Sequence, residues 1–396
     1  MTRIRRTAAT AVIALLLPLP VAAAGTAFAA APETSAATPS TAPAGSSVQL
    51  QLPRPTGPHA VGRSTLHLVD EHRQDPWVPA AGPRQLMVSM YYPARPHSGE
   101  PAPYMTTEEA RLFLAMEDIP DSAVPARELV DTRTYAYDNA RPEQGKYPLV
   151  VLSPGFKLPR ATLTGLAVDL ASRGYVVALV DHTYEDSGTT FPDGQTLGCE
   201  LCTHPTNDPA AIESSRAEDV SFVLDQLVGR HPAWPYAHMI DPKRIGMAGH
   251  SIGGAAAVPT MVADQRVRAG IDLDGSIDTS IPPTGLNGRP FLLLGNPVNH
   301  DVGGDEHSWS VAWPQLDGWK RWLTIAGTTH VSFTDVPLLA TEAGIPGANG
   351  SISALRALEI THTYVAAFFD QQLKGTPQPL LDGPSQTYPE VDFQHP

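Results

Sequence analysis

One short stretch restricts the fold of this chain more than any other: residues 244–258, which read RIGMAGHSIGGAAAV. Small and apolar residues lead into Gly-His-Ser-Ile-Gly around Ser251, and alanines follow soon after. Gly249 and Gly253 suit the middle of neither a strand nor a helix, but they leave room for a very sharp backbone turn. The stretch therefore predicts a strand, a tight turn and a helix, with a strained serine whose hydroxyl is exposed above a sheet.

The chain around this turn has an α/β pattern. From residue 147 onward, continuous apolar runs alternate with helical patterns, as in a mostly parallel sheet that helices cover on both faces. Two earlier apolar runs, 65–73 and 84–94, have no helix between them, which predicts an antiparallel start to the sheet. The expected later strands are 147–156, 175–182, 244–251, 267–275, 289–296 and 320–330, and the expected helices are 162–174, 213–230, 252–264 and 351–375.

Residues 94–143 stand outside this alternation. They contain two stretches with helical character, 106–119 and 122–131, with prolines between them. We interpret the segment as a helical insertion with apolar faces. We expect its residues 104–130 to form a lid over the mouth of the active-site pocket.

The first 58 residues precede the folded domain. Residues 1–29 combine a basic start, a short apolar run and an Ala-Phe-Ala cleavage site, which together predict a secretory signal peptide. Pro18 and Pro20 interrupt the apolar run, which argues against an uncleaved membrane anchor. Residues 30–58 are rich in Ala, Pro, Ser and Thr and predict a flexible lead-in. The catalytic domain then covers 59–396, and the mature protein is expected to be secreted and extracellular.

Charge and cysteine content narrow the possible partners. The chain has a net charge of −14, which becomes −17 when the three arginines of the leader are removed. An acidic protein of this kind is a poor ligand for nucleic acid or for anionic membranes. Cys199 and Cys202 are the only cysteines, and in an exported protein such a close pair predicts a local disulfide rather than a metal site.

A serine hydroxyl is a weak nucleophile, so Ser251 needs a base and an acid that orients the base. In the chain order Ser, acid, His, the base is expected after the last strand, where His330 stands. Asp274 ends the strand 267–275 and Asp301 follows the next one, so both are candidates for the acid. Asp272 points the same way as Asp274 but lies deeper, and we expect it to be structural.

An oxyanion formed when a serine attacks a carbonyl needs two backbone N–H donors. One is expected from Ile252, which follows the serine. The other is expected from Phe156, in the loop after the strand 147–156, because Gly155 lets that loop approach closely.

A second polar group follows the strand 175–182. Asp181, His182, Glu185 and Asp186 are expected on the same side of the sheet as Ser251. Ion pairing and loop capping are commoner than catalysis for such groups, so we expect a structural role.

The chain resembles the platelet-activating-factor acetylhydrolase family of secreted α/β hydrolases, in its bacterial lipase-like branch. The resemblance runs in order through most of residues 60–335 and rests on RQLMVSMYYPA, VVLSPGF, YVVALVDHTYED, GHSIGG, GIDLDG and TTHVSFTD. It implies an α/β-hydrolase fold. It also implies Ser251 as nucleophile, Asp274 rather than Asp301 as acid and His330 as base, with Phe156 and Ile252 as oxyanion donors.

The expected function is that of a secreted serine carboxylic-ester hydrolase that works through an acyl-enzyme on Ser251. A cutinase-like polyester hydrolase uses the same chemistry and is one alternative. A catalytically silent α/β hydrolase that only binds ligands is another. We expect a small-molecule or lipid ester as substrate, no cofactor or metal, no nucleic acid, no stable membrane insertion and a monomer.

Overall fold

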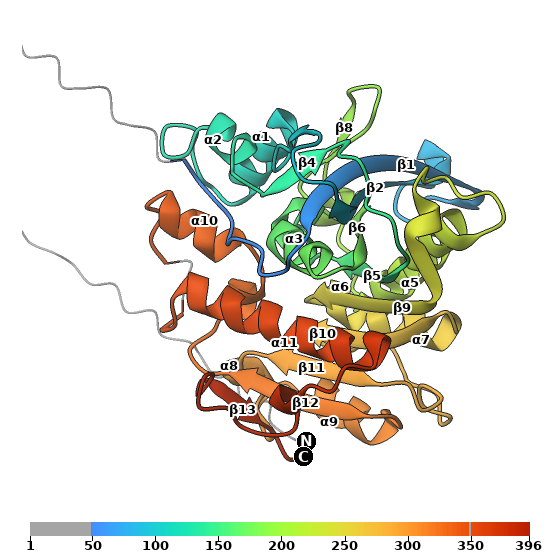
Figure 1. Cartoon of the computed structure of the whole chain (residues 1–396), viewed down its shortest axis with the longest axis vertical. Coiled ribbons are helices and arrows are strands. Elements are labelled where there is room, and N and C mark those ends of the chain that lie inside the picture. Colours follow the sequence, from blue (N-terminus) through green and yellow to red (C-terminus); the bar gives the residue numbers. More distant parts are fainter. Residues whose placement is uncertain (1–48, 348–349) are drawn as a thin grey trace, which may run out of the picture. The chain divides into compact units, whose positions relative to one another are not determined.

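The computed structural model describes residues 49–347 and 350–396 (Figure 1). The predicted signal peptide, 1–29, and residues 30–48 of the predicted lead-in lie outside the described residues. Within the described ranges, no helix has both the length and the apolar character needed to cross a membrane.

An eleven-stranded sheet organises the described residues, in the order β13-β12-β11-β10-β9-β5-β6-β2-β1-β4-β3. Neighbours from β12 to β6 are parallel, whereas β1 pairs antiparallel with β2, β2 with β6, and β12 with β13. The predicted mostly parallel sheet with an antiparallel start is confirmed. Its strands are β1 Ala60–Gln74, β2 Pro83–Ala94, β3 Glu100–Pro101, β4 Ala136–Asp138, β5 Tyr147–Ser153, β6 Val176–His182, β9 Ile240–His250, β10 Val267–Leu273, β11 Phe291–Gly295, β12 Lys320–Ile325 and β13 Val391–Phe393.

Helices cover both faces of this sheet. Side chains of α5 and α7 pack in the apolar cluster on one face, and those of α3 and α11 pack in the cluster on the other. Helix α11 crosses in front of the sheet in Figure 1. The helices of the domain are α3 Thr164–Ser172, α4 Glu200–Thr203, α5 Pro209–Val228, α6 Ile252–Ala255, α7 Ala257–Ala263, α8 Pro297–His300, α9 Ser308–Ala312, α10 Val336–Glu342 and α11 Ala354–Lys374, and a small hairpin pairs β7 Thr189–Thr190 with β8 Thr196–Leu197.

Strand β5 explains why the central strands read as unbroken apolar runs. Successive side chains of a strand point to opposite faces. Leu149 and Val151 accordingly belong to the cluster under α5, while Val150 and Leu152 belong to the cluster under α11. Because both faces are buried, every position needs an apolar side chain.

The folded domain begins earlier than the sequence predicted. Residues 30–58 were expected to be a flexible lead-in, but residues 49–58 pack against the domain. Leu50 and Leu52 are buried, and the Leu52 N–H donates to the Arg133 carbonyl at 3.0 Å. Thr56 and Gly57 also donate hydrogen bonds to Asp169 and Ser172, so the segment is anchored although its Pro-rich composition resembles that of a linker.

The insertion 94–143 contains the two predicted helices, α1 Thr107–Met116 and α2 Ala126–Val130. Helix α1 begins with a capping box, in which Thr106 and Glu109 satisfy each other's backbone N–H groups. The insertion buries its apolar side chains in a cluster that it shares with a few residues of the N-terminal segment, of the loop after β5 and of α10. That cluster comprises Leu50, Leu52, Tyr104, Met105, Ala110, Phe113, Leu114, Val124, Ala126, Leu129, Leu158, Ala161 and Leu339.

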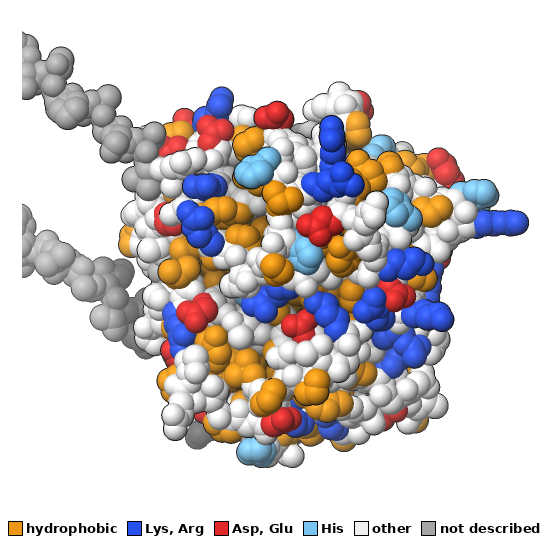
Figure 2. All heavy atoms as spheres, viewed as in Figure 1, with side chains coloured by type: hydrophobic (Ala, Val, Ile, Leu, Met, Phe, Trp, Pro, Cys, Tyr) orange, Lys and Arg blue, Asp and Glu red, His pale blue; other side chains and the backbone are white. Residues whose placement is uncertain are grey.

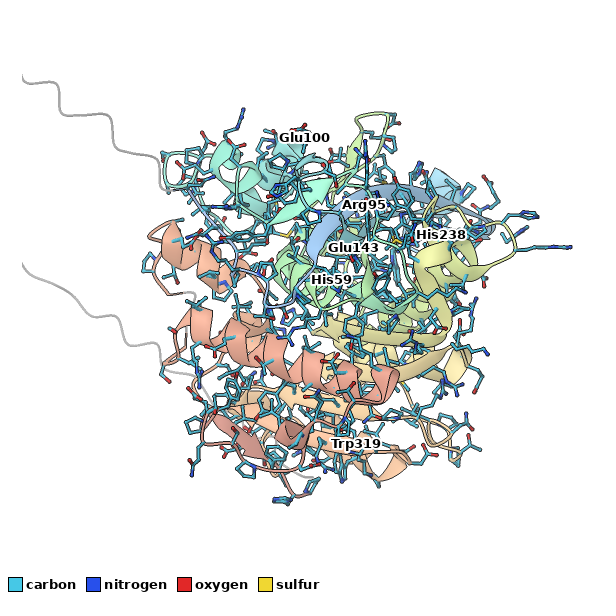
Figure 3. The ribbon with its side chains drawn as sticks, viewed as in Figure 1. His59, Arg95, Glu100, Glu143, His238 and Trp319 are labelled. Carbon is cyan, nitrogen blue, oxygen red and sulfur yellow. A yellow bond between two sulfur atoms is a disulfide. The ribbon has the colours of Figure 1, made fainter. Side chains whose placement is uncertain are left out.

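Polar contacts tie the end of the insertion to the start of the domain. His59 precedes β1 and Glu143 precedes β5, and the two side chains lie side by side (Figure 3), with Nδ1 and Oε2 2.9 Å apart. On the face of the described residues shown in Figure 2, basic and acidic side chains are interspersed, with apolar side chains scattered between them.

Candidate active site

Ser251 lies in the tight turn between β9 and α6, as the sequence predicted. Its backbone has φ 56° and ψ −133°, a conformation that residues other than glycine rarely adopt. A Cβ atom on Gly249 would collide with the backbone of Gly253, and one on Gly253 would collide with the Ser153 carbonyl. The glycines are therefore required by the close approach of the turn to β5.

Ser251, His330 and Asp274 form one hydrogen-bonded series, which we call the exposed line. His330 Nε2 lies 2.9 Å from Ser251 Oγ, and His330 Nδ1 lies 2.6 Å from Asp274 Oδ2. Ser251 follows β9, His330 follows β12 and Asp274 follows β10. The parallel sheet therefore brings them together at the carboxyl ends of its strands, although 79 positions separate Ser251 from His330. Since a carboxylate only accepts hydrogen bonds, Nδ1 carries the proton and Nε2 is left to accept the serine hydroxyl.

Asp301, the other candidate for the acid, does not contact His330 and bonds to other side chains. Asp301 Oδ1 accepts hydrogen bonds from Thr324 Oγ1 and Gln394 Nε2, both at 3.1 Å. The fully buried Asp272 accepts from the Gly275 N–H at 2.9 Å, and burial raises its pKa well above the usual range. Of the three aspartates considered from the sequence, the structure places Asp274 beside His330.

Asn296 is a site residue that the sequence analysis missed. Its backbone N–H donates to Asp274 Oδ1 at 2.6 Å, and its side-chain amide contacts both carboxylate oxygens, at 2.8 and 2.7 Å. Asn296 directly follows β11, the neighbour of β10 in the sheet. An asparagine in that position could have signalled a partner for the acid.

His250 is a second residue whose role the motif did not reveal. It is buried, its ring centroid lies 4.7 Å from that of His330, and its Nε2 donates to the His330 carbonyl at 2.7 Å. Burial, with the nearby positive charge that His330 can carry, lowers the pKa of His250 to about 3. A neutral His250 thus holds the backbone of His330 in place.

The two expected oxyanion donors lie at the same site. Phe156 and Ile252 line one cavity with Ser251. Within the ranges that the structure describes, neither backbone N–H has a hydrogen-bond partner. A Cβ atom on Gly155 would lie only 2.7 Å from His250 Nδ1, so glycine is needed for the loop to come this close.

Comparison with known proteins identifies the family. The sequence profile described as "Platelet-activating factor acetylhydrolase, isoform II" matches residues 44–200 and 234–377. The chain belongs to this family. A relative named "Probable 1-alkyl-2-acetylglycerophosphocholine esterase", from Arthroderma benhamiae, is 31% identical over 376 residues, covering 86% of this chain and 93% of the relative.

Two bacterial proteins extend the comparison. The solved structure of a ferulic acid esterase from Streptomyces cinnamoneus is 46% identical, with a TM-score of 0.79, and the alignment covers 88% of this chain and all of that one. A bis(hydroxyethyl) terephthalate hydrolase from Streptomyces coelicolor is 27% identical over 152 residues, 38% of this chain and 39% of the relative. This acetylhydrolase-family protein has the predicted α/β-hydrolase fold and is a serine ester hydrolase.

The cavity of this acetylhydrolase-family protein has a volume of about 410 Å³. One wall comes from the segment that joins β8 to α5 and from the first turns of α5. Its other walls come from the ends of the central strands. Besides the exposed line and the two expected donors, the lining residues are Leu201, Pro205, Thr206, Pro209, Ile212, Ser276, Asp278, Asn299 and His300.

The insertion does not form the expected lid. None of residues 94–143 lines the cavity at Ser251. The insertion lies at the far edge of the sheet, where β5, β6, β2 and β1 separate its strands β4 and β3 from β9. Its apolar faces predicted a cover for the pocket, but they are buried against each other and against Leu158, Ala161 and Leu339 of the domain.

The predicted disulfide between Cys199 and Cys202 is present, and it stands beside the pocket. It brackets Leu201, whose N–H donates to the Tyr184 carbonyl at 3.1 Å and whose side chain lines the cavity. The disulfide segment therefore holds the wall that we had expected the insertion to provide.

His300 forms another part of the wall. Its ring stacks on Trp309 with centroids 3.8 Å apart, and its Nε2 lies 3.7 Å from Asp274 Oδ1. On the other side, its Nδ1 is 3.2 Å from Glu306 Oε2. Burial alone would raise the pKa of Glu306, but the adjacent His300 imidazole and hydrogen bonding from Ser308 lower it to about 2.

Proposed function

We propose that this protein hydrolyses carboxylic esters through an acyl-enzyme on Ser251. Ser251 Oγ attacks the ester carbonyl while His330 Nε2 accepts its proton, and Asp274 holds the imidazole in the required tautomer. The Phe156 and Ile252 N–H groups bind the oxyanion. His330 then returns the proton to the leaving alcohol, and water releases the acid by the same steps.

One observation carries this proposal: the exposed line ends at a serine that opens on a cavity with two free backbone N–H groups. Nucleophile, base, orienting acid and oxyanion donors are the parts that acyl transfer requires. Each step is supplied by the side chains and backbone of this chain, with water as the only co-reactant.

We also propose a substrate class, namely esters of compact aromatic acids such as ferulic acid. The support is the ferulic acid esterase, which is 46% identical over 88% of the chain. The apolar wall formed by Leu201, Ile212 and Phe156 suits a planar acyl group. The alternatives are the acetylglycerophosphocholine and terephthalate esters named for the other relatives.

The test is a comparison of kcat/KM for methyl ferulate, an acetylglycerophosphocholine, bis(hydroxyethyl) terephthalate and a polyester film. Methyl ferulate is expected to be the best substrate. A faster reaction with the phospholipid or the polyester would contradict the substrate class alone. If the wild-type protein cleaves none of the esters and a fluorophosphonate does not label it, the proposal is contradicted and the protein is a catalytically silent α/β hydrolase.

We further propose that residues 1–29 direct export and are removed, that residues 30–48 link the leader to the domain, and that the mature protein is an extracellular monomer. The basic start, short apolar run and Ala-Phe-Ala site support the leader. Mass spectrometry of the protein from culture medium, with light scattering for its size, tests this. A protein retained in cells with residues 1–29 intact would contradict it.

A further inference from the structure

A second hydrogen-bonded series of a serine, a histidine and an aspartate adjoins residues 154–158, the loop that carries Phe156, which we call the oxyanion loop. His182 Nε2 is 2.9 Å from Ser153 Oγ, and His182 Nδ1 is 2.8 Å from Asp219 Oδ2. Ser153 ends β5, His182 ends β6, and Asp219 lies on α5. We call this series the buried line, because each of its residues is at most 1% exposed.

The protonation states of Asp219 and His182 determine which atom donates in each hydrogen bond of the buried line. Although burial opposes it, the charge of Arg84 and the bond from His182 hold the pKa of Asp219 well below its usual range, so Asp219 is an acceptor. His182 therefore donates from Nδ1. Burial, together with the charge of Arg216, lowers the pKa of His182, so its Nε2 is free to accept the Ser153 hydroxyl.

Arg216 connects the buried line to the oxyanion loop. Its Nη1 donates to Ser153 Oγ at 3.1 Å and to the Pro154 carbonyl, and its Nε donates to Glu185 Oε2 at 2.7 Å. The guanidinium is 1% exposed. Ser153 thus donates a hydrogen bond to His182 and accepts one from Arg216, and it directly precedes the loop that carries Phe156.

The loop is held at several points on either side of Phe156. Arg216 binds the Pro154 carbonyl, and the Gly155 carbonyl accepts the Leu158 N–H at 3.2 Å. Lys157 donates to the Glu185 carbonyl at 2.9 Å. In a trans peptide the C=O and N–H groups point in opposite directions, so fixing the Gly155 carbonyl also fixes the direction of the Phe156 N–H.

The charges around the buried line are balanced by arginines. Arg84, which is fully buried, donates to Asp219 at 2.8 Å and to Asp75 at 2.9 Å. His182, Glu185 and Asp219 offer ligand atoms within 4.8 Å of one another, as a metal site does. The guanidinium groups of Arg84 and Arg216 already supply positive charge to these acids.

A buried ion network of this size is weak evidence for stability, because desolvation offsets most of the attraction. Apolar side chains of similar volume often stabilise a core equally well. They cannot, however, hold a carbonyl in one orientation. The directional contacts to Ser153 and Pro154 therefore indicate a role in geometry.

We propose that Arg216, supported by the buried line, is a positioning residue that aims the Phe156 N–H at the ester oxyanion. The inference rests on the proposed function. Arg216 touches no reacting atom, since Pro154 and Gly155 lie between it and Phe156. Removing its contact lets the Pro154–Gly155 peptide rotate. Because Gly155 joins that peptide to the one that carries the Phe156 N–H, the rotation displaces the Phe156 donor, which then stabilises the transition state less.

The decisive variant is Arg216→Lys. An ammonium keeps the charge beside Glu185 but lacks the fork that reaches Glu185, Ser153 and Pro154 together. We expect kcat for methyl ferulate or a nitrophenyl ester to fall by about 10- to 100-fold with KM within about twofold, because a whole oxyanion donor is worth about 10²–10³ in kcat. Affinity for a trifluoromethyl ketone, which forms an oxyanion on Ser251, is expected to fall in parallel.

The matched control is Arg289→Lys. Arg289 is also buried and donates to backbone carbonyls, among them those of Leu286 and Val267, but it stands before β11 at the opposite end of the sheet. Both variants are expected to lower the melting temperature, whereas only Arg216→Lys lowers kcat and the ketone affinity. Unchanged kcat in a folded Arg216→Lys, with a melting temperature as low as that of the control, would overturn the inference.

A second variant keeps the test open if Arg216→Lys does not fold. Ser153→Ala removes only the hydroxyl that links His182 to Arg216, and we expect about a tenfold loss of kcat with KM unchanged. Full kcat and ketone affinity in folded Ser153→Ala would overturn the inference while leaving the acyl-enzyme proposal intact. A wild-type protein that hydrolyses no ester would instead contradict the proposed function, and the inference with it.

Discussion

The exposed line and the buried line have nearly the same bond lengths. Serine and histidine are 2.9 Å apart in both, and histidine and aspartate are 2.6 Å apart in the first and 2.8 Å in the second. They differ in what surrounds the serine. Ser251 lines the cavity, whereas Ser153 is fully buried and its Oγ bonds only to Arg216 and His182 among the residues that the structure describes. The residue types and distances of a triad therefore do not by themselves make a nucleophile.

The histidines differ in the same way. The His330 side chain is 45% exposed and can turn toward a leaving group, but that of His182 is 1% exposed and lies beside Arg216. An attacking serine needs a histidine that can take up a proton and become positively charged. The charge of Arg216 opposes that step at His182. The buried line can orient its neighbours, but it cannot carry out general base catalysis.

The largest expected effect separates the two serines. Ser251→Ala should lower kcat by about 10⁴-fold or more, because it removes the nucleophile. Ser153→Ala should keep Ser251 reactive toward a fluorophosphonate and lose only about tenfold. Labelling followed by peptide mapping identifies the modified serine, and circular dichroism checks folding. A label on Ser153, or full activity in Ser251→Ala, would reverse the assignment of the two lines.

The next effect concerns the acid of the exposed line. Asp274→Asn should lower kcat by about 10⁴-fold, because an amide favours the wrong tautomer of His330. Asp301→Asn is the control, since Asp301 contacts Thr324 and Gln394 instead, and it should keep most of the activity. The measurement is kcat for both variants. If Asp301→Asn is the inactive one, Asp274 is not the acid.

The exposed line could be predicted from the sequence because its signals are local. The Gly-x-Ser-x-Gly turn marks Ser251, the end of the last parallel strand marks His330, and the family resemblance selects Asp274 over Asp301. The strand pattern predicted the central sheet for a similar reason, since two buried faces leave long apolar runs. In these cases the residues of one segment are enough to predict its structure or its role.

The buried line could not be predicted, because its meaning depends on contacts between distant segments. Arg216 reads as a surface residue of an ordinary helix, and only the packing of α5 against β5 brings it to Pro154. His182 and Glu185 were expected to be structural, but nothing in the sequence linked them to the oxyanion loop. The lid prediction was wrong for a related reason, since apolar helices look alike whether they cover a pocket or each other.

His250 lies between His330 of the exposed line and the loop that carries Phe156, and pH can test its role. It precedes Ser251, binds the His330 carbonyl and lies against Gly155. Its pKa is about 3 in the fold because of burial, whereas an unfolded histidine has a pKa near 6.5. As pH falls from about 6.5 to about 3, the unfolded chain takes up a proton that the folded chain does not, so stability falls with pH.

The variant His250→Gln should weaken this dependence. Removing one such proton reduces the slope of unfolding free energy against pH by up to about 1.4 kcal/mol per pH unit within that window. Urea titrations between pH 4 and pH 7 measure the slope for both proteins. Equal slopes would show that His250 is not held neutral by the fold, and would weaken the view that it is a fixed support for His330.

The smallest expected effect concerns the cavity that distinguishes the exposed line. Leu201→Ala and Leu114→Ala remove the same atoms from two buried leucines, one in the cavity wall and one in the insertion. Each should destabilise the fold by about 2–5 kcal/mol. Only Leu201→Ala should lower the ratio of kcat/KM for a feruloyl ester over an acetyl ester, by about tenfold, because it removes apolar contact to the planar acyl group. The same change in preference with Leu114→Ala would mean that the insertion does reach the substrate. No change with Leu201→Ala would mean that the disulfide segment does not select the acyl group. Access to Ser251 would then be set by the segments after β10 and β11, which carry Ser276 and Asn299.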